Sequence, residues 1–213
     1  MAGMEIPSTR GRPQVLVLPG GKPVSTAAAR WWHLSQLRTA LLTESLRLRL
    51  SGTGITVRQV RYTVRGWNGD VRSPVQDGLR ALDEIRRRRP DAPIGLVGHS
   101  MGGRAVAHLA AQPQVEAVVA LAPWWPEGDA ALIPPGRRLL VAHGTADRWT
   151  DPSVSESQTE AARRRGVDAT WQPFPGAGHF LLTRPGRWHE LTADFLSEAL
   201  APATHSPGGS REH

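Results

Sequence analysis

The sequence predicts an α/β fold built on a parallel sheet, because short apolar runs alternate with longer segments of helical periodicity along most of the chain. The apolar runs occupy residues 15–18, 55–60, 94–97, 117–121, 138–142 and 169–174. The segments with helical periodicity occupy residues 26–42, 74–89, 101–111, 153–165 and 187–200. Parallel strands need crossover connections, and right-handed crossovers through helices cover both faces of a sheet. We therefore expect about six mostly parallel strands with helices on both faces.

Length and composition indicate one compact domain. The chain has 213 residues, of which 39% are hydrophobic and 21% charged, values that are ordinary for a globular protein. We expect an N-terminal extension over residues 1–13, an α/β domain over 14–200 and a tail over 201–213. The tail is rich in proline, glycine, serine and charge and has no periodicity, so we expect it to be disordered.

Several classes of protein are disfavoured by what the sequence lacks. No apolar stretch approaches the 18 or so residues of a membrane span, and the first residues lack the apolar core of a signal peptide. We therefore expect a cytoplasmic protein without stable membrane association. The chain has no cysteine, which excludes disulfides, thiolate metal sites and a cysteine nucleophile. Its histidines show no metal-binding spacing, so we expect neither a metal nor a cofactor.

The formal net charge of +7 raises the question of a nucleic-acid partner. The densest arginine runs, at 86–89 and 163–165, each end a segment of helical periodicity. Cations at that place offset the negative end of the helix dipole. No basic stripe interleaved with aromatic residues is present. We therefore expect no nucleic-acid partner.

The most informative motif is GHSMGG, which begins at Gly98 and lies between the apolar run 94–97 and an alanine-rich helical segment. A tight strand-to-helix turn strains its central residue, here Ser100, and exposes the hydroxyl above the sheet edge. Positions two before and two after must be tiny, and they are Gly98 and Gly102. A bare GxSxG also arises by chance in ordinary loops. The strand before it and the helix after it favour a nucleophile elbow, with Ser100 as the nucleophile.

A serine nucleophile requires a histidine base and a carboxylate that orients the base. Asp147 follows the apolar run 138–142, and His179 follows the run 169–174. The carboxyl ends of parallel strands meet at one edge of a sheet, so these side chains can reach Ser100. We therefore predict Ser100, Asp147 and His179 as the catalytic residues.

Other polar residues near these positions offer alternative assignments. Asp151 precedes Pro152 at an expected helix start, where an aspartate usually caps free backbone N–H groups. Asp147 lies closer to the strand end and is favoured as the acid. His99 and His143 fall at strand ends, where we expect them to pack or to form hydrogen bonds.

Three motifs together resemble the α/β-hydrolase family: GHSMGG, HGTAD ending at Asp147, and GAGHF containing His179, each at a strand's carboxyl end. The resemblance extends over about residues 15–200. It implies that the backbone N–H groups of Gly21 and Met101 bind the oxyanion, each contact being worth roughly 3 kcal/mol. Many relatives carry His-Gly before the first of these donors, whereas here Pro19 replaces the histidine.

Two features set this chain apart from larger relatives. Only about fourteen residues precede the first strand, so the antiparallel pair that opens the sheet in larger relatives is expected to be missing. Relatives with large hydrophobic substrates often insert a cap domain where residues 122–137 stand here, and this segment is too short for one. We therefore expect no cap domain and an open site.

The tryptophans suggest the character of the substrate. Those that follow proposed strands at the expected catalytic edge are Trp67, Trp124, Trp125 and Trp149. They predict a pocket for an apolar or aromatic group. The alternative is that tryptophans bury helices against the sheet, as we expect for Trp31, Trp32 and Trp188.

These observations together predict a serine hydrolase that cleaves carboxylic esters of small molecules through an acyl-enzyme on Ser100. Thioesterases, peptidases and other acyl hydrolases share this chemistry and fold, and they remain alternatives. A catalytically silent binding protein is a further alternative. It would be favoured by a substitution at Ser100, Asp147 or His179, and the sequence has none.

Overall fold

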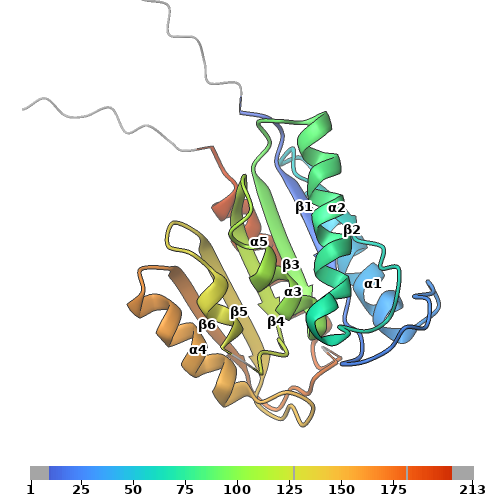
Figure 1. The fold of residues 1–213 in the computed structure, drawn as a ribbon. Coiled ribbons are helices and arrows are strands. Elements are labelled where there is room, and N and C mark those ends of the chain that lie inside the picture. Colours follow the sequence, from blue (N-terminus) through green and yellow to red (C-terminus); the bar gives the residue numbers. More distant parts are fainter. Residues whose placement is uncertain (1–9, 127, 181, 203–213) are drawn as a thin grey trace, which may run out of the picture.

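A six-stranded sheet forms the centre of the computed structural model, which describes residues 10–126, 128–180 and 182–202 (Figure 1). The strand order is β2-β1-β3-β4-β5-β6, and every neighbouring pair is parallel. The strands are β1 (Gln14–Leu18), β2 (Thr56–Gln59), β3 (Ile94–His99), β4 (Val115–Leu121), β5 (Arg138–Gly144) and β6 (Asp168–Phe174). The expected parallel sheet is confirmed.

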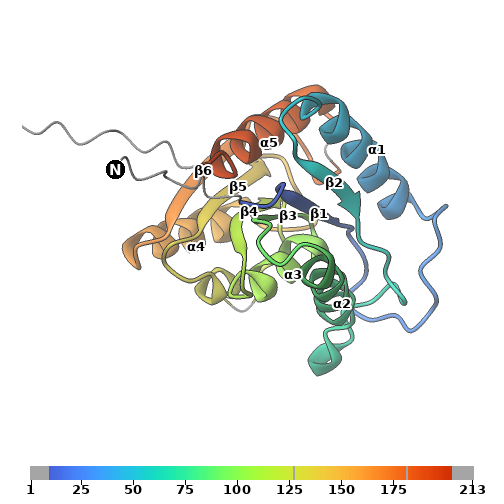
Figure 2. The ribbon, with the colours of Figure 1, turned by 90° about the horizontal axis from the view of Figure 1, so that it is seen from above.

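Helices cover both faces of this sheet, as Figure 2 shows. They are α1 (Leu34–Arg49), α2 (Ser73–Arg88), α3 (Met101–Leu109), α4 (Pro152–Arg164) and α5 (Pro185–Ala199), with short 3-10 turns η1 (Gly69–Val71) and η2 (Asp129–Leu132). On one face α1 packs against α5, and on the other α2 packs against α3. Each face has its own apolar core, one centred on Leu96 and Leu109 and the other on Val97 and Trp188.

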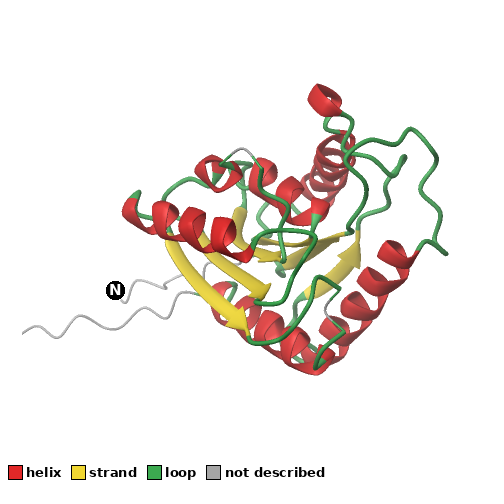
Figure 3. Cartoon of the chain, turned by 90° about the horizontal axis from the view of Figure 1, so that it is seen from below, coloured by secondary structure: helices red, strands yellow, loops and turns green. Residues whose placement is uncertain are grey.

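The central strands are continuous apolar runs because both of their faces are covered. Every residue of β1 and β3 is buried. The arginine runs end α2 and α4 as expected, with Arg86 and Arg163 in the last turns of those helices. The strands therefore run from this arginine-rich side toward the opposite edge, where their carboxyl ends and the loops that follow them meet (Figure 3).

The first helix was predicted wrongly. It covers Leu34–Arg49, whereas helical periodicity was expected over 26–42. The segment before it pairs instead with a later loop: the Lys22 N–H donates to the Arg65 carbonyl at 2.9 Å, and the Arg65 N–H donates to the Ala27 carbonyl at 3.0 Å. These bonds occupy backbone groups that a helix would use for itself.

Two of the tryptophans expected against the sheet also lie elsewhere. Trp31 and Trp32 belong to the turn directly before α1, and they are 75% and 54% exposed. Trp188, by contrast, is fully buried and stacks on Phe174 with ring centroids 3.9 Å apart. Only Trp188 therefore packs a helix against the sheet as expected.

The described part of the segment 122–137 contains no helix longer than the 3-10 turn η2. No cap domain therefore covers the carboxyl edge there. Residues 1–9 of the expected extension and 203–213 of the expected tail lie outside the described residues. Among the helices that are described, none is long and apolar enough to cross a membrane.

Candidate active site

Ser100 lies at the turn from β3 to α3 with φ 56° and ψ −116°, a conformation that only glycine adopts readily. Its backbone is held on both sides. The Ser100 N–H donates to the Leu121 carbonyl at 3.0 Å, and its own carbonyl accepts the Trp124 N–H at 3.1 Å. The bonds to these residues, at and beyond the end of β4, hold the strained turn in place.

The glycines that flank Ser100 have no room for a side chain. A Cβ atom on Gly98 would lie 2.1 Å from the carbonyl oxygen of Gly102. One on Gly102 would lie 2.1 Å from the carbonyl oxygen of Leu18, and one on Gly103 would lie 2.8 Å from Pro123. The turn is therefore as tight as the motif predicts.

Three predicted side chains form one hydrogen-bonded chain. His179 Nε2 lies 2.9 Å from Ser100 Oγ, and His179 Nδ1 lies 2.7 Å from Asp147 Oδ2. Since an ionised carboxylate only accepts, Nδ1 carries the proton and Nε2 is left to accept the serine O–H. Asp147 has its side chain fully buried, and that of His179 is nearly so.

Asp147 is held as a carboxylate by its neighbours. Its Oδ2 accepts from His143 Nε2 at 3.0 Å and from Thr150 Oγ1 at 2.9 Å, and its Oδ1 accepts the N–H groups of Trp149 and Thr150 at 2.7 and 3.0 Å. Burial by itself would raise the pKa of Asp147, but the hydrogen bonds from His143, His179 and these backbone groups outweigh it and hold the pKa well below its ordinary value. Asp147 therefore stays ionised.

Two partners of this carboxylate were not predicted from the sequence. His143 was expected only to pack or to form hydrogen bonds, and it connects Asp147 to Ser155 Oγ, 3.0 Å from its Nδ1. Thr150 was not singled out, yet its hydroxyl also lies 3.2 Å from His179 Nδ1. The alternative acid, Asp151, caps α4 by accepting the Ser153 N–H at 2.8 Å.

His99 supports the backbone of His179. Its Nε2 lies 2.8 Å from the His179 carbonyl oxygen, so it donates an N–H there. Burial, assisted by the neighbouring His179, lowers the pKa of His99 to about 3. His99 is therefore a neutral donor that holds the loop of His179 in place.

The loop of Gly21 passes directly against Ser100 and Met101. A Cβ on Gly21 would lie 2.3 Å from Met101 Cε and 2.4 Å from the Arg65 carbonyl oxygen, and one on Gly20 would lie 3.5 Å from Ser100 Cβ. Within the described residues, neither the N–H of Gly21 nor that of Met101 donates to another protein group. Two unused donors therefore lie beside the serine, one on the loop of Gly21 and one at the first residue of α3.

The four predicted pocket tryptophans differ in exposure. Trp149 is 74% exposed and stacks on His179, with ring centroids 6.3 Å apart and planes 23° apart. Trp124 is partly exposed and meets Trp67 edge-on at 6.2 Å. Trp67 and Trp125 are buried, and the Trp125 indole N–H donates to a backbone carbonyl of α3 at 3.0 Å. Trp149 and Trp124 are thus the two that present surface.

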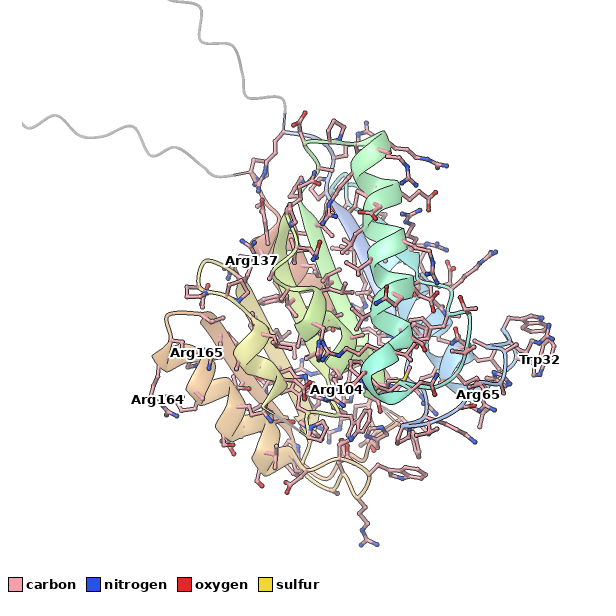
Figure 4. All side chains as sticks on the ribbon, in the orientation of Figure 1. Trp32, Arg65, Arg104, Arg137, Arg164 and Arg165 are labelled. Carbon is pink, nitrogen blue, oxygen red and sulfur yellow. The ribbon has the colours of Figure 1, made fainter. Side chains whose placement is uncertain are left out.

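A buried ion pair fixes the segment after β4 to the elbow helix. Arg104 Nε on α3 donates to Asp129 Oδ1 on η2 at 2.7 Å, and both side chains are almost fully buried. The Arg104 guanidinium lies 4.4 Å from the ring centroid of Trp67 and 4.9 Å from that of Trp124 (Figure 4). This cluster holds Trp124 beside the serine.

Two hollows described on the surface differ in their distance from the candidate site. The larger cavity, of about 1080 Å³, lies along the outer edge of β2 between α1 and α2, away from Ser100. A shallow hollow of about 300 Å³ lies over residues 147–152. No group of three or more histidine, aspartate or glutamate side chains in the described part of the chain could hold a metal ion.

The family model described as "Alpha/beta hydrolase family" matches residues 15–196. The chain belongs to the α/β-hydrolase family. No curated protein matches this hydrolase.

Solved structures share the fold of this α/β hydrolase at low sequence identity. An alpha-beta serine hydrolase homologue from Coxiella burnetii is 17% identical with a TM-score of 0.66, over 87% of this chain and 85% of that one. XC6422 from Xanthomonas campestris, a serine hydrolase described as having no lid, is 22% identical with a TM-score of 0.66, over 93% and 87%. The apo form of Thermogutta terrifontis esterase 2 is 20% identical with a TM-score of 0.66, over 93% and 88%.

Proposed function

We propose that this α/β hydrolase cleaves carboxylic esters through an acyl-enzyme on Ser100. The observation that supports this most strongly is the unbroken hydrogen-bonded chain from Ser100 Oγ through the His179 ring to Asp147. It gives a serine both a base and an anion that fixes the tautomer of that base. Membership of the family and the likeness to solved esterases agree with this chemistry.

In the first half of the reaction, His179 Nε2 takes the proton of Ser100 Oγ, and Oγ attacks the ester carbonyl carbon. The N–H groups of Gly21 and Met101 bind the oxyanion that forms. As the oxyanion collapses, the bond to the alcohol breaks and the alcohol oxygen takes the proton from His179. In the second half, His179 removes a proton from water, the hydroxide attacks the acyl-enzyme, and Ser100 leaves with that proton. Asp147 stays ionised throughout.

The substrate is a small molecule with an apolar or aromatic part. Trp149 and Trp124 contact it in this proposal, because both present surface near Ser100. Trp67 and Trp125 are buried and support the site from behind. A Trp149→Ala variant should lower kcat/KM for aromatic esters several-fold more than for acetate esters, and equal losses would remove Trp149 from the substrate site.

A fluorophosphonate probe tests the proposal, because it reacts with an activated serine and requires little else of the protein. We expect one adduct per chain, located on Ser100 by peptide mass, and none in Ser100→Ala. A matched control is Ser157→Ala, which removes an exposed serine hydroxyl from α4 and should label normally. A folded protein that forms no adduct, or an adduct elsewhere, would overturn the proposal and favour a silent binding protein.

Comparison of matched esters, thioesters and amides then separates an esterase from a thioesterase or a peptidase. We expect the ester with an alkyl alcohol to be cleaved with a higher kcat/KM than the corresponding amide. The reverse order would indicate a peptidase, and a strong preference for the thioester would indicate a thioesterase.

A further inference from the structure

A half-buried cation packs on Phe180, the residue that follows His179. The Arg38 guanidinium on α1 is 4.6 Å from the ring centroid of Phe180, and that ring packs against His179 with centroids 5.3 Å apart. Arg38 is partly buried, and burial lowers its pKa. It forms no ion pair or hydrogen bond with any described residue, so no anion in the described part of the chain pairs with its charge.

Arg38 differs in this respect from Arg47, which lies further along the same helix. Arg47 forms an ion pair with Glu44 one turn before it, and it also donates to the Val57 carbonyl at 2.9 Å. Glu44, the acidic residue of α1, is therefore already paired, at the end of the helix that lies away from the serine. Arg38 lies near the other end, which faces the carboxyl edge of the sheet.

Three further cations gather around His33, just before α1. Lys22, Arg30 and Arg65 all lie close enough to His33, just before α1, to lower its pKa together with burial, the largest cause. Figure 4 shows Arg65 projecting on the side where Trp32 lies. None of these three forms an ion pair with an acid in the described part of the chain.

Two of these cations, Lys22 and Arg38, adjoin residues of the candidate site. Lys22 directly follows Gly21, the proposed oxyanion donor, and its N–H binds the Arg65 carbonyl. The charge of Arg38 reaches His99, whose pKa it helps to lower. Asp147 does not pair with this charge, because its buried carboxylate binds histidine, threonine and backbone donors instead.

We propose that Arg38 binds a carboxylate on the substrate, so that this hydrolase prefers esters that carry a negative charge over neutral esters of the same size. The inference rests on the proposed function. A half-buried guanidinium has lost part of its hydration and gains when an anion arrives. The neighbouring cations add to the positive potential at the mouth of the site.

The test compares two pairs of esters in which only the charge changes. Monoethyl adipate and ethyl hexanoate carry or lack a carboxylate on the acyl part. The 3-carboxyphenyl and phenyl esters of butyrate carry or lack it on the alcohol part. We expect kcat/KM for the charged member of one pair to exceed that for its neutral partner about fivefold, the size expected of one partly exposed ion pair. The ratio should fall in high salt.

Variants then assign the preference to Arg38. In Arg38→Gln the ratio should fall to about one, while kcat/KM for the neutral ester stays within about twofold. Arg38→Lys should retain part of the preference. Arg87→Gln is the matched control, because it removes one positive charge from the last turn of α2, at the other edge of the sheet, and should leave the ratio unchanged.

The possible outcomes separate this inference from the proposed function. A protein that is labelled at Ser100 but cleaves neither member of either pair overturns ester hydrolysis and the anion site together. A protein that is labelled and cleaves both members of each pair equally overturns the anion site alone. A preference that survives in Arg38→Gln assigns the charge recognition elsewhere and also overturns it. Absence of both labelling and hydrolysis overturns the proposed function and this inference together. Thermal unfolding of each variant identifies any that fail to fold, and Arg38→Lys then decides.

Discussion

Replacement of Asp147 by asparagine tests the proposed mechanism most directly. In the wild-type protein Asp147 Oδ1 accepts two backbone N–H groups, which cannot turn away. The asparagine carbonyl oxygen must therefore occupy that position, and its NH₂ group must take the position of Oδ2, 2.7 Å from His179 Nδ1. Two donors would then face each other unless the His179 ring changes tautomer.

The changed tautomer removes the base. With Nδ1 accepting from the amide, Nε2 carries the hydrogen and points it at Ser100 Oγ, 2.9 Å away, so it cannot take the serine proton. We expect kcat to fall about 10⁴-fold, the loss that this substitution causes in a serine protease triad. That factor corresponds to about 5.5 kcal/mol of transition-state stabilisation.

The assay is the steady-state hydrolysis of a 4-nitrophenyl ester, together with the rate at which fluorophosphonate labels Ser100. Both rates should fall by a similar factor in Asp147→Asn. The matched control is Asp151→Asn, which removes a charge four residues away, and asparagine caps a helix as well as aspartate does. This control should keep nearly full activity.

A loss smaller than tenfold in Asp147→Asn would refute the reasoning, because it would show that His179 keeps its tautomer without the carboxylate. An equal loss in Asp151→Asn would refute the choice of acid.

Three other changes probe the fold around the site, each measured by urea unfolding. Gly98→Ala forces a Cβ to 2.1 Å from a backbone carbonyl oxygen and should lower the free energy of unfolding by at least about 3 kcal/mol. The control Gly186→Ala meets open space and should lower it by under about 0.5 kcal/mol. Similar losses in the two variants would contradict the tight turn. His99 has a folded pKa of about 3 against an ordinary 6.5, so the unfolded chain binds the proton and stability falls as pH drops from 6.5 toward 3. Between pH 6.5 and 5 the wild type should lose about 2 kcal/mol more than His99→Asn, and parallel losses would argue against a neutral buried His99. Arg104→Met leaves Asp129 buried without its main cation and should lower the free energy of unfolding by about 3 kcal/mol. Adding Asp129→Leu should recover much of that loss. A double variant no more stable than the single one would show that the unpaired carboxylate is not the cause of the loss.

The strands and most helices could be predicted from the sequence because each leaves a local pattern. All six strands, and the four helices after α1, lie within about two residues of their expected bounds. The α1 helix was misplaced because alanine and arginine at 26–30 satisfy helical propensity, while the bonds of Lys22 and Ala29 to residues 63–65 are long-range and leave no local signal. Tertiary pairing overrode propensity there.

The candidate site likewise combines residues that local patterns predict with long-range contacts that they do not predict. Ser100, Asp147 and His179 follow strand ends in a recognisable order, so their meeting at one edge could be expected, and their catalytic role stays a prediction. The bond between His143 and Asp147 could have been suspected from their spacing of four residues in HGTAD. The contact of Arg38 with Phe180 joins a helix near the start of the chain to a loop near its end, and no sequence spacing predicts it.

The strained backbone of Ser100 has a consequence for how this protein could change over time. Its φ of 56° and ψ of −116° suit glycine, so exchanging the serine for glycine would relieve roughly 1–3 kcal/mol and make the chain more stable. A mutation that stabilises the fold at this position would thus abolish the proposed chemistry. Stability alone would favour glycine at position 100. Continued selection for an activated hydroxyl is therefore needed to keep Ser100 in place.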